Sequence, residues 1–441
     1  MKKKPHAGPR FFKPAAKSLK VERRVIDVKI ERLSDEGRGI AFDNGKAIFV
    51  PTVLPGEVAR VRTLEQKRSA VEAELIELIE PAANRIAPRC KLFGRCGGCQ
   101  LQMLSAADQL AHKQSTLAHL LAPFTKAKSF QWATPLTAAP WHYRHRARLA
   151  VAAVDGQPVI GFKGNNSHQV VAVDACPILD ERLQPLLSAI PQWLAQLTQW
   201  RRLEEILIAV DADGQLAMDW NAQRAFPKAD AEKLQVLAQS ANIQCGTAAT
   251  LVYRSAAVGG EFVYGIRDFT QVNPAINDLL SQRVIDWLEP SADDVIADFF
   301  CGLGNFTLPL ARRAKAVTGF ESSHAMVERA TRYAAQVICG NARFELLDLF
   351  ESADALADQF NVDQFDKVLL DPPRAGAKSA CERLAKFKHL RRIVYVSCNP
   401  QTLVRDIEIL ASGGFSVERA ALVDMFPQTG HCEAIVQLCR K

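Results

Sequence analysis

Apolar and polar residues alternate in several short segments near the beginning of the chain. The alternation predicts strands at residues 25–30, 47–51, 57–62 and 71–79. Short strands that are joined by glycine turns within about 60 residues are typical of a small β-barrel. We therefore expect an OB-like barrel over residues 25–82.

From residue 266 onward the pattern changes, because apolar runs of strand length alternate with segments of helical periodicity. Strands are predicted at residues 295–298, 316–321, 343–347, 367–371, 393–397 and 434–438. This alternation predicts a doubly wound, Rossmann-like α/β domain over residues 266–441.

The region between these two parts has a mixed pattern. A helix is predicted at residues 105–121, and residues 130–265 combine strand-like and helix-like segments. We interpret residues 83–265 as a central α+β domain.

Charge is unevenly distributed along the chain. The whole chain has a net charge of +7, and residues 1–24 hold nine Lys or Arg against one acid, Glu22. This segment is rich in Lys, Pro and Ala, which predicts a basic disordered tail with an affinity for polyanions. A solubility tail without a specific partner explains the same composition.

The composition also bears on the compartment. No apolar run reaches the roughly 18 residues of a membrane span, and the basic N-terminus lacks the apolar stretch of a secretory signal. The eleven cysteines are scattered and odd in number. This usage indicates reduced thiols in a cytoplasmic protein without membrane association.

A strand, a glycine turn and the start of a helix follow one another at residues 295–307. Gly302 and Gly304 would let the backbone approach a ligand, and Glu321 ends the next strand, where a carboxylate can accept ribose hydroxyls. Thr307 fills the place of the third glycine of a dinucleotide fingerprint, which argues against NAD. S-adenosylmethionine fits better, with Asp348 placed to meet the adenine. A nucleotide-type fold without a ligand remains the alternative.

Two further strand ends carry candidate chemistry. After the fourth strand, Asp371-Pro372-Pro373-Arg374 resembles the turn of amine methyltransferases, but Arg374 replaces the aromatic residue that would stack on an amine. This difference argues against N-methylation. Cys398 follows the fifth strand, at the edge where ligands bind in such sheets, and is the candidate nucleophile. A lone cysteine is otherwise most often a buried apolar residue.

Together these motifs resemble the RNA uracil-5-methyltransferase family. The resemblance rests on residues 298–309, 371–374, 397–400 and 431–433, with residues 268–273 similar to the family's cofactor-side segment. It implies Cys398 as the nucleophile, Glu433 as the base and S-adenosylmethionine as the donor. The donor site it implies consists of Gln271, Phe300, Asn305, Glu321, Asp348 and Asp371. Phe299 and Cys432 stand where leucine and valine are more usual.

The implied chemistry explains why a cysteine and a base are needed. Carbon 5 of uracil is a weak nucleophile, and addition of a thiolate at carbon 6 gives an enolate that can attack a methyl group. A base must then remove the carbon-5 proton so that the thiol is eliminated. Glu433 is the best candidate, and His431 is an alternative.

Cys90, Cys96 and Cys99 lie in one loop, a spacing that indicates a metal or iron–sulfur site. Spacing alone leaves the fourth ligand open, with Cys176 as the nearest downstream candidate. The 23S rRNA branch of the family carries a [4Fe-4S] cluster, which implies Cys90, Cys96, Cys99 and Cys176 as ligands here.

The predicted barrel also indicates which branch of the family this chain resembles. Residues 25–79 resemble a TRAM barrel, and the tRNA branch lacks both barrel and cluster, whereas a second rRNA branch lacks only the barrel. The resemblance therefore implies an enzyme that acts on 23S rRNA, and we expect a monomer. A tRNA uracil-5-methyltransferase and a non-catalytic RNA-binding protein with a relic fold remain the alternatives.

Two basic segments are candidates for RNA contact. Residues 141–148 interleave aromatic and basic side chains, which suits stacking on RNA, although a strand with paired charges has the same pattern. A basic face is expected on the barrel, formed by Arg38, Lys46, Arg60, Arg62, Lys67 and Arg68.

Overall fold

The computed structural model describes residues 23–66, 70–165, 167–223, 226–255, 260–337, 339–352, 356 and 364–440. The chain divides into two compact units, Met1–Ala87 and Pro88–Lys441. The predicted tail lies almost entirely outside the described residues. Within the described part of the chain, no helix is both long and apolar enough to cross a membrane.

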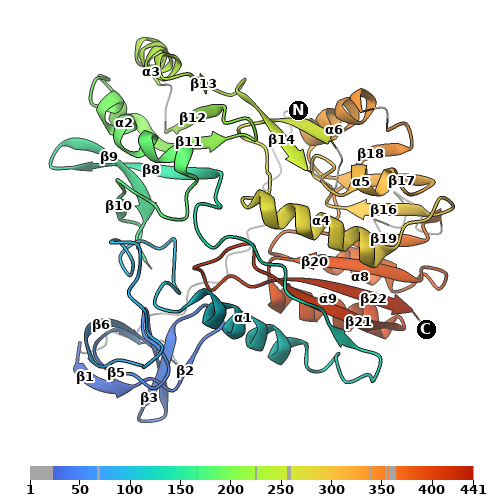
Figure 1. The fold of residues 1–441 in the computed structure, drawn as a ribbon, viewed down its shortest axis with the longest axis horizontal. Coiled ribbons are helices and arrows are strands. Elements are labelled where there is room, and N and C mark those ends of the chain that lie inside the picture. Colours follow the sequence, from blue (N-terminus) through green and yellow to red (C-terminus); the bar gives the residue numbers. More distant parts are fainter. Residues whose placement is uncertain are drawn as a thin grey trace, which may run out of the picture. The chain divides into compact units, whose positions relative to one another are not determined.

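The first unit is one curled six-stranded sheet with the strand order β1-β5-β6-β4-β3-β2. Its strands are β1 (Val25–Lys29), β2 (Arg32–Leu33), β3 (Gly39–Asp43), β4 (Lys46–Val50), β5 (Val58–Gln66) and β6 (Ala70–Glu80). β1 also lies against β3, so the curled sheet encloses a small apolar core that includes Ile30, Ile48 and Val61. Figure 1 shows these strands in blue.

The expected basic face of this unit is largely neutralised. Arg38 pairs with Glu72 at 2.9 Å, and Arg62 pairs with Glu74 on the neighbouring strand. Arg60 binds both Asp27 and Glu77. Strand pairing therefore places acidic side chains beside three of the predicted cations, and exposed pairs of this kind leave little net field. Lys67 and Arg68 lie outside the described residues.

The second unit contains a mixed sheet in the order β10-β9-β8-β11-β12-β13, followed along the chain by the hairpin β14-β15. The strands are β8 (Arg146–Val154), β9 (Gln157–Lys163), β10 (Val170–Ala172), β11 (Leu203–Val210), β12 (Leu216–Ala222), β13 (Ile243–Cys245), β14 (Thr250–Ser255) and β15 (Gly260–Gly265). Helices α2 (Gln184–Leu194) and α3 (Lys228–Ser240) contribute Leu187, Ile190 and Leu234 to the core of this sheet.

Several residues of the segment 141–148 are engaged in packing within the unit. Tyr143 and His145 are buried, and the Tyr143 hydroxyl donates to the Pro427 carbonyl. The Arg146 guanidinium donates to the carbonyls of Ile266 and Asp268. These three side chains therefore serve the packing of the unit rather than a surface for stacking on bases.

The largest sheet has eight strands in the order β18-β17-β16-β19-β20-β22-β21-β7. Its strands are β16 (Val295–Phe299), β17 (Ala316–Glu321), β18 (Ala342–Leu346), β19 (Lys367–Leu370), β20 (Arg392–Ser397), β21 (Phe415–Val423), β22 (Glu433–Arg440) and β7 (Gln131–Trp132). Strands β16 to β20 are mutually parallel, and β22 runs antiparallel to β20 and β21. The doubly wound domain predicted from the sequence is confirmed.

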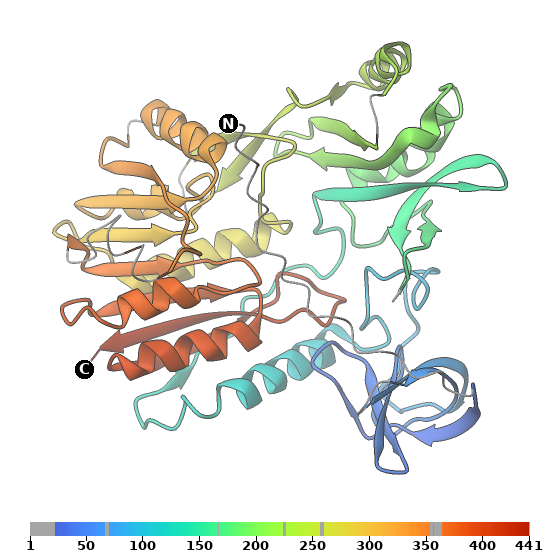
Figure 2. The same cartoon turned by 180° about the vertical axis from the view of Figure 1, so that it is seen from behind.

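Helices cover both faces of this sheet. On one face α4 (Pro274–Leu288), α5 (Thr307–Ala311) and α6 (His324–Gln336) share an apolar core with inward residues such as Ile296 and Val394. On the other face lie α1 (Ala106–Leu121), α8 (Lys378–Leu384) and α9 (Pro400–Ser412), which bury Phe299 and Tyr395. Figure 1 has α4 on the near side of the sheet, and Figure 2 brings α8 and α9 to the near side.

Helix α1 starts as its sequence predicts. Ser105 caps it, because its hydroxyl accepts a hydrogen bond from the Asp108 amide at 3.1 Å. Leu117 and Leu121 then pack into the core shared with α9. α1 and β7 thus belong to the predicted central region by sequence, yet they pack on the large sheet.

Candidate active site

The predicted site residues converge at the carboxyl edge of the large sheet. Strands β16 and β19 pair with each other in the middle of the sheet. From β16 the chain continues outward to β17 and β18, and from β19 it continues in the opposite direction to β20, so the strand order reverses between β16 and β19. Ligands bind outside the strand ends at such a switch point. Asn305, Glu321, Asp348, Asp371 and Cys398 all follow or end strands at this edge.

The turn after β16 has the backbone of a ligand-binding loop. Phe300, Gly302 and Gly304 have positive φ angles of 65°, 57° and 88°. A Cβ on Gly304 would lie 2.8 Å from the Phe344 ring, so glycine is required there for packing. A Cβ on Gly302 would meet no heavy atom within 4 Å, which leaves space in front of this backbone.

Glu321 joins the glycine turn to the start of the next helix. Its carboxylate accepts from the Gly302 amide at 3.2 Å and from the Ser323 amide at 2.9 Å. The side chain is only half-buried. A carboxylate that is fixed at the end of the second strand is the group that binds ribose hydroxyls in nucleotide-type folds.

Two carboxyl groups lie beneath this turn, the buried Asp298 and the half-buried Asp371. Asp298 accepts the Thr307 hydroxyl at 2.6 Å, and its second oxygen has no partner within the described residues. Burial raises the pKa of Asp298 to about 7, and it raises the pKa of Asp371 to about 7 with a further contribution from the Asp298 charge. The pair therefore holds protons to near neutral pH, and a cationic group placed beside it, such as a sulfonium or an ammonium group, would favour the ionised carboxylates.

Gln271 lies on a segment that several contacts hold in place. The Arg146 guanidinium donates to Asp268 O, to Ile266 O and to the Thr270 hydroxyl, and the His145 ring contacts the Val272 carbonyl at 3.0 Å. In the next turn of chain, Asn277 and Asn305 exchange two amide hydrogen bonds of 2.8 and 2.9 Å. Helix α4, which directly follows this segment, is thereby tied to the glycine turn.

Phe300 and Asp348 meet at the far end of the turn. The rings of Phe300 and Phe350 are 5.5 Å apart and tilted by 56°, and the Phe350 amide donates to Asp348. Phe350 and Asp348 are both exposed. Two aromatic rings beside an exposed carboxylate can accept a purine and its amino group.

The strand register places Cys398 opposite Glu433. Ser397 of β20 pairs with Ala434 of β22, so the register continued by one residue brings Cys398 and Glu433 together. Residues that are opposite each other in an antiparallel pair point to the same face of the sheet. The thiol is half-buried and the carboxyl is buried.

Burial and nearby charges shift the pKa values of both groups. Burial, together with the charges of Glu433 and Asp371, raises the pKa of Cys398 to about 12, and the Arg374 charge opposes this rise. Burial also raises the pKa of Glu433 to about 8; Asp371 adds to the rise, and Lys113 and Arg374 oppose it. A carboxyl with this pKa can gain and lose a proton near neutral pH, as general-base catalysis requires.

The connection that carries Arg374 is anchored from below. The Arg374 carbonyl accepts hydrogen bonds from Asn399 at 2.9 Å and from Thr402. Buried Asp406 accepts from the Tyr395 hydroxyl and from the Ala377 amide, both at 2.6 Å. The Arg374 guanidinium lies 3.4 Å from the His431 ring, on the same side as Cys398 and Glu433.

The predicted iron–sulfur cluster is wrong for this structure. Among the described residues, no group of three or more His, Cys, Asp or Glu side chains is arranged to hold a metal ion. Cys90, Cys96, Cys99 and Cys176 are partly buried free thiols. Burial raises the pKa of Cys99 to about 12, with further contributions to this value from Cys176, Cys96 and Cys90, and it also raises the pKa values of Cys96 and Cys176.

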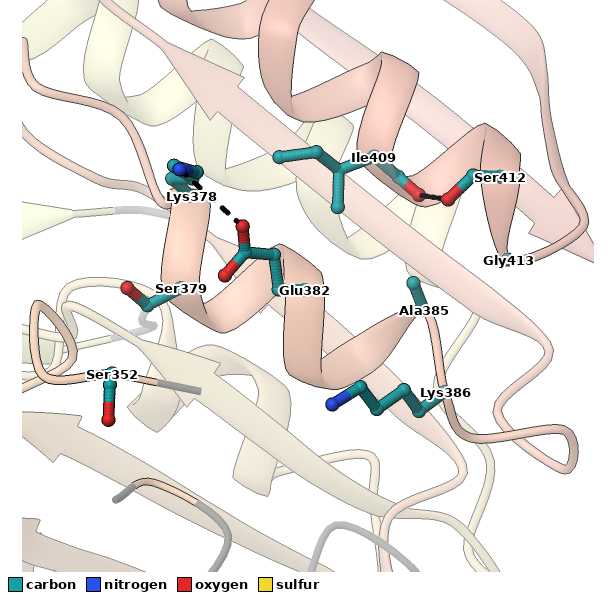
Figure 3. A pocket seen from close by; sticks show the side chains of 9 residues that line it. All are labelled: Ser352, Lys378, Ser379, Glu382, Ala385, Lys386, Ile409, Ser412 and Gly413. Carbon is teal, nitrogen blue, oxygen red and sulfur yellow. Dashed lines mark hydrogen bonds and ion pairs between the residues drawn. The ribbon is translucent and has the colours of Figure 1, made fainter. Parts of the chain in front are cut away.

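A surface pocket between α8 and α9 lies apart from this chemistry. Figure 3 shows Lys378 and Glu382 pointing toward each other at its rim, with Ser412 bonded to the Ile409 carbonyl. None of the residues predicted for the donor site or for catalysis lines it.

The fold and the strand-end site define a Rossmann-like methyltransferase with a cysteine beside its donor loop. The chain belongs to the tRNA (Uracil-5-)-methyltransferase family, whose sequence pattern matches residues 105–441. The TRAM domain pattern matches residues 20–76, which identifies the first unit.

The chain is similar to several curated proteins over nearly its whole length. It is 38% identical to the 23S rRNA (uracil(1939)-C(5))-methyltransferase RlmD of Pseudomonas putida, covering 98% of this chain and 98% of that protein. The RlmD protein of Shewanella frigidimarina is 36% identical, covering 97% of this chain and 98% of that protein.

A solved structure shares the fold. The tRNA (uracil-54, C5)-methyltransferase of Pyrococcus abyssi, in complex with S-adenosyl-L-homocysteine, superposes with a TM-score of 0.72 at 22% identity. The match covers 94% of this chain and 100% of that chain.

The sequence did not reveal two charged residues near the site. Lys113 lies within a helix of ordinary amphipathic pattern, and Asp424 follows a strand that was not predicted. One signal was available: the helical periodicity of α1 places Lys113 on the same buried face as Leu117 and Leu121.

Proposed function

We propose that this protein transfers a methyl group from S-adenosylmethionine to carbon 5 of uracil in 23S rRNA, at position 1939 as in its RlmD relatives. The observation that carries the proposal is the β20–β22 register, which sets Cys398 against Glu433 at the edge that also holds the donor loop. The chain is similar to proteins named for this activity over nearly its whole length, which supports 23S rRNA as the substrate.

The chain's residues divide the reaction into two steps. After Cys398 has lost its proton, the thiolate sulfur bonds to carbon 6, which moves the ring's electron pair to carbon 5 and the carbonyl oxygen. Carbon 5 then takes the donor's methyl group as the bond between that methyl group and the sulfonium sulfur breaks, which leaves S-adenosylhomocysteine. Glu433 removes the carbon-5 proton, the carbon–carbon double bond returns, and the carbon–sulfur bond breaks. The thiolate is released together with 5-methyluridine.

The donor site is proposed on the same edge of the sheet. Phe300, Asn305 and the glycine turn would face the amino-acid part, and Glu321 the ribose. Asp348 would meet the adenine, and Gln271 and Asp371 would complete the lining of the donor site. S-adenosylmethionine supplies the methyl group when bound. The open space at Gly302 and the unpartnered oxygen of Asp298 support this fit.

The target uracil must leave its stack to reach Cys398, because the thiol is half-buried at a strand end. We propose that the TRAM unit helps to hold the RNA. Its arginines are mostly paired, so the contact is expected to depend on shape and backbone groups as well as on charge.

The test is methyl transfer to separate 23S rRNA and tRNA transcripts. Wild-type protein is expected to methylate the rRNA transcript at one uracil, and Cys398→Ala is expected to lose transfer while retaining RNA binding. Cys245→Ala is the matched control, because this half-buried thiol lies on β13 of the other sheet. Full transfer by Cys398→Ala would overturn the mechanism.

A tRNA substrate is the second candidate. The matched family is described as one of tRNA methyltransferases, and the similar solved structure is that of a tRNA methyltransferase. Faster transfer to the tRNA transcript than to rRNA would favour that candidate over the first.

A further inference from the structure

Helix α1 places a buried cation close to the proposed base. The Lys113 side chain is 1% exposed, and its ammonium donates to the Asp424 carboxylate at 2.7 Å and to the Phe426 carbonyl at 2.9 Å. A buried charge is costly unless it is paired and hydrogen-bonded. This lysine has both kinds of partner, and both lie on the connection between β21 and β22.

That connection, residues 424–432, leads directly to Glu433. Its Gln428 has a φ of 71° and exchanges two hydrogen bonds of 2.9 Å with Gln109 of α1. The Gln428 carbonyl also accepts from the Gln100 and Leu101 amides. Two residues of one helix face, Gln109 and Lys113, therefore fix the chain immediately before the base.

The charged groups around Glu433 come from four elements. Asp371 and Arg374 lie after β19, Lys113 lies on α1, and Asp424 follows β21. Cys398 faces Glu433 from the end of β20, and His431 precedes it by two residues beside Arg374. Two cations and two carboxyl groups thus act on one buried carboxyl, so the loss of any one should be measurable.

We propose that Lys113 and Asp424 form a buried charge pair that positions the connection to Glu433 and sets how readily this carboxylate accepts the carbon-5 proton. The inference rests on the proposed function and assigns positioning residues on an element that holds none of the reacting groups. The pair acts through Glu433 and does not touch the uracil.

Electrostatics gives the two members opposite effects. Loss of the Lys113 charge removes a cation and leaves the Asp424 charge uncompensated, so the pKa of Glu433 should rise. Loss of the Asp424 charge leaves the lysine uncompensated, so the pKa of Glu433 should fall. A purely structural role of the same contact has no such reversal of sign, since both variants would only loosen the connection.

The experiment measures, in a single turnover and as a function of pH at constant ionic strength, the rate at which free methylated 23S rRNA transcript is released from the protein, because this step follows removal of the carbon-5 proton. This rate should rise with pH as Glu433 loses its proton. Lys113→Met should move the pH midpoint of this rise upward by about one unit, a size that the loss of one neighbouring charge produces. Asp424→Asn should move it downward. Lys113→Arg should restore the wild-type midpoint, and Lys126→Met, on an exposed lysine just beyond α1, should leave it unchanged.

The outcomes separate this inference from the proposed function. Shifts of both variants in one direction, or no shift in either, overturn the inference. If Lys113→Met does not fold, the direction of the Asp424→Asn shift decides alone. If Glu433→Gln keeps the pH dependence of the wild-type rate, Glu433 is not the base, and it is the proposed function that fails.

Discussion

Cys398 and Glu433 face each other one residue beyond the Ser397–Ala434 pair of strands β20 and β22. Thirty-five residues of sequence separate them, and only the antiparallel return of the last strand brings them together. The site can hold both groups in their neutral forms, because burial raises the pKa of Cys398 to about 12 and that of Glu433 to about 8.

Because the pKa of Glu433 is raised, we expect the rate of product release to depend on pH. Below about pH 8 most Glu433 is protonated and cannot accept the carbon-5 proton, so release of the product should quicken as the pH rises through this region. Glu433→Asp should keep such a limb at a lower rate, because the shorter side chain reaches less well. Quench-flow measurement of product release from pH 6 to 9 tests this, and a flat profile contradicts it.

Because the pKa of Asp298 is raised, we expect the free energy of unfolding to depend on pH. Its pKa is raised to about 7 in the folded protein from an ordinary value of 3.8, so the folded state holds a proton that the unfolded chain releases. Its contribution to stability is therefore present at low pH and is lost between about pH 4 and pH 7, by about 1.4 kcal/mol for each unit of pKa difference.

Asp298→Asn should remove this dependence. The amide oxygen can still accept the Thr307 hydroxyl, so the local structure is expected to persist. The difference between the urea midpoints of the variant and the wild type should grow in the variant's favour from pH 5 to pH 8 without donor. A difference that stays constant over this range would contradict the assignment.

Gly304 should tolerate no side chain. Its φ of 88° and the approach of Phe344 within 2.8 Å of a Cβ combine strain with overlap, so Gly304→Ala should cost about 1–3 kcal/mol. Gly302→Ala has a positive φ without overlap and is the matched comparison. It should cost less stability and instead weaken donor binding. Urea unfolding and calorimetric titration with S-adenosylmethionine measure the two effects, and equal unfolding costs would contradict the account.

Asp406 should be important for the connection that holds Arg374. Asp406→Ala leaves the Tyr395 hydroxyl, the Ala377 amide and the Arg405 guanidinium without their acceptor, at a cost of about 3–5 kcal/mol. Tyr395→Phe removes one of these bonds and should cost about 1 kcal/mol. Thermal unfolding of the two variants checks the order, and similar losses in both would contradict it.

Local patterns predicted the elements whose signals are local. The glycine turn after β16, the Ser105 cap of α1 and the acidic end of β17 are each determined by a few neighbouring residues, so their positions agree with the structure. The apolar runs of a parallel sheet also identified strands β16, β17, β19 and β20 within a residue or two.

Features that depend on distant partners were harder to predict. The arginines of β5 face acids on β1 and β6, so a basic face that is plain in sequence is largely neutral in the structure. Tyr143 is buried by a contact with Pro427, 284 residues away. The cysteine spacing showed which thiols share a loop, but it did not determine their geometry or their protonation.

The most direct test of the central claim is to trap the covalent RNA adduct. Glu433→Gln, incubated with S-adenosylmethionine and the 23S rRNA transcript, should accumulate a protein–RNA species that survives denaturing gel electrophoresis. After digestion, mass spectrometry should find a methylated uridine on the peptide that contains Cys398. An adduct on another residue, or none while the wild type methylates the same transcript, would contradict the account.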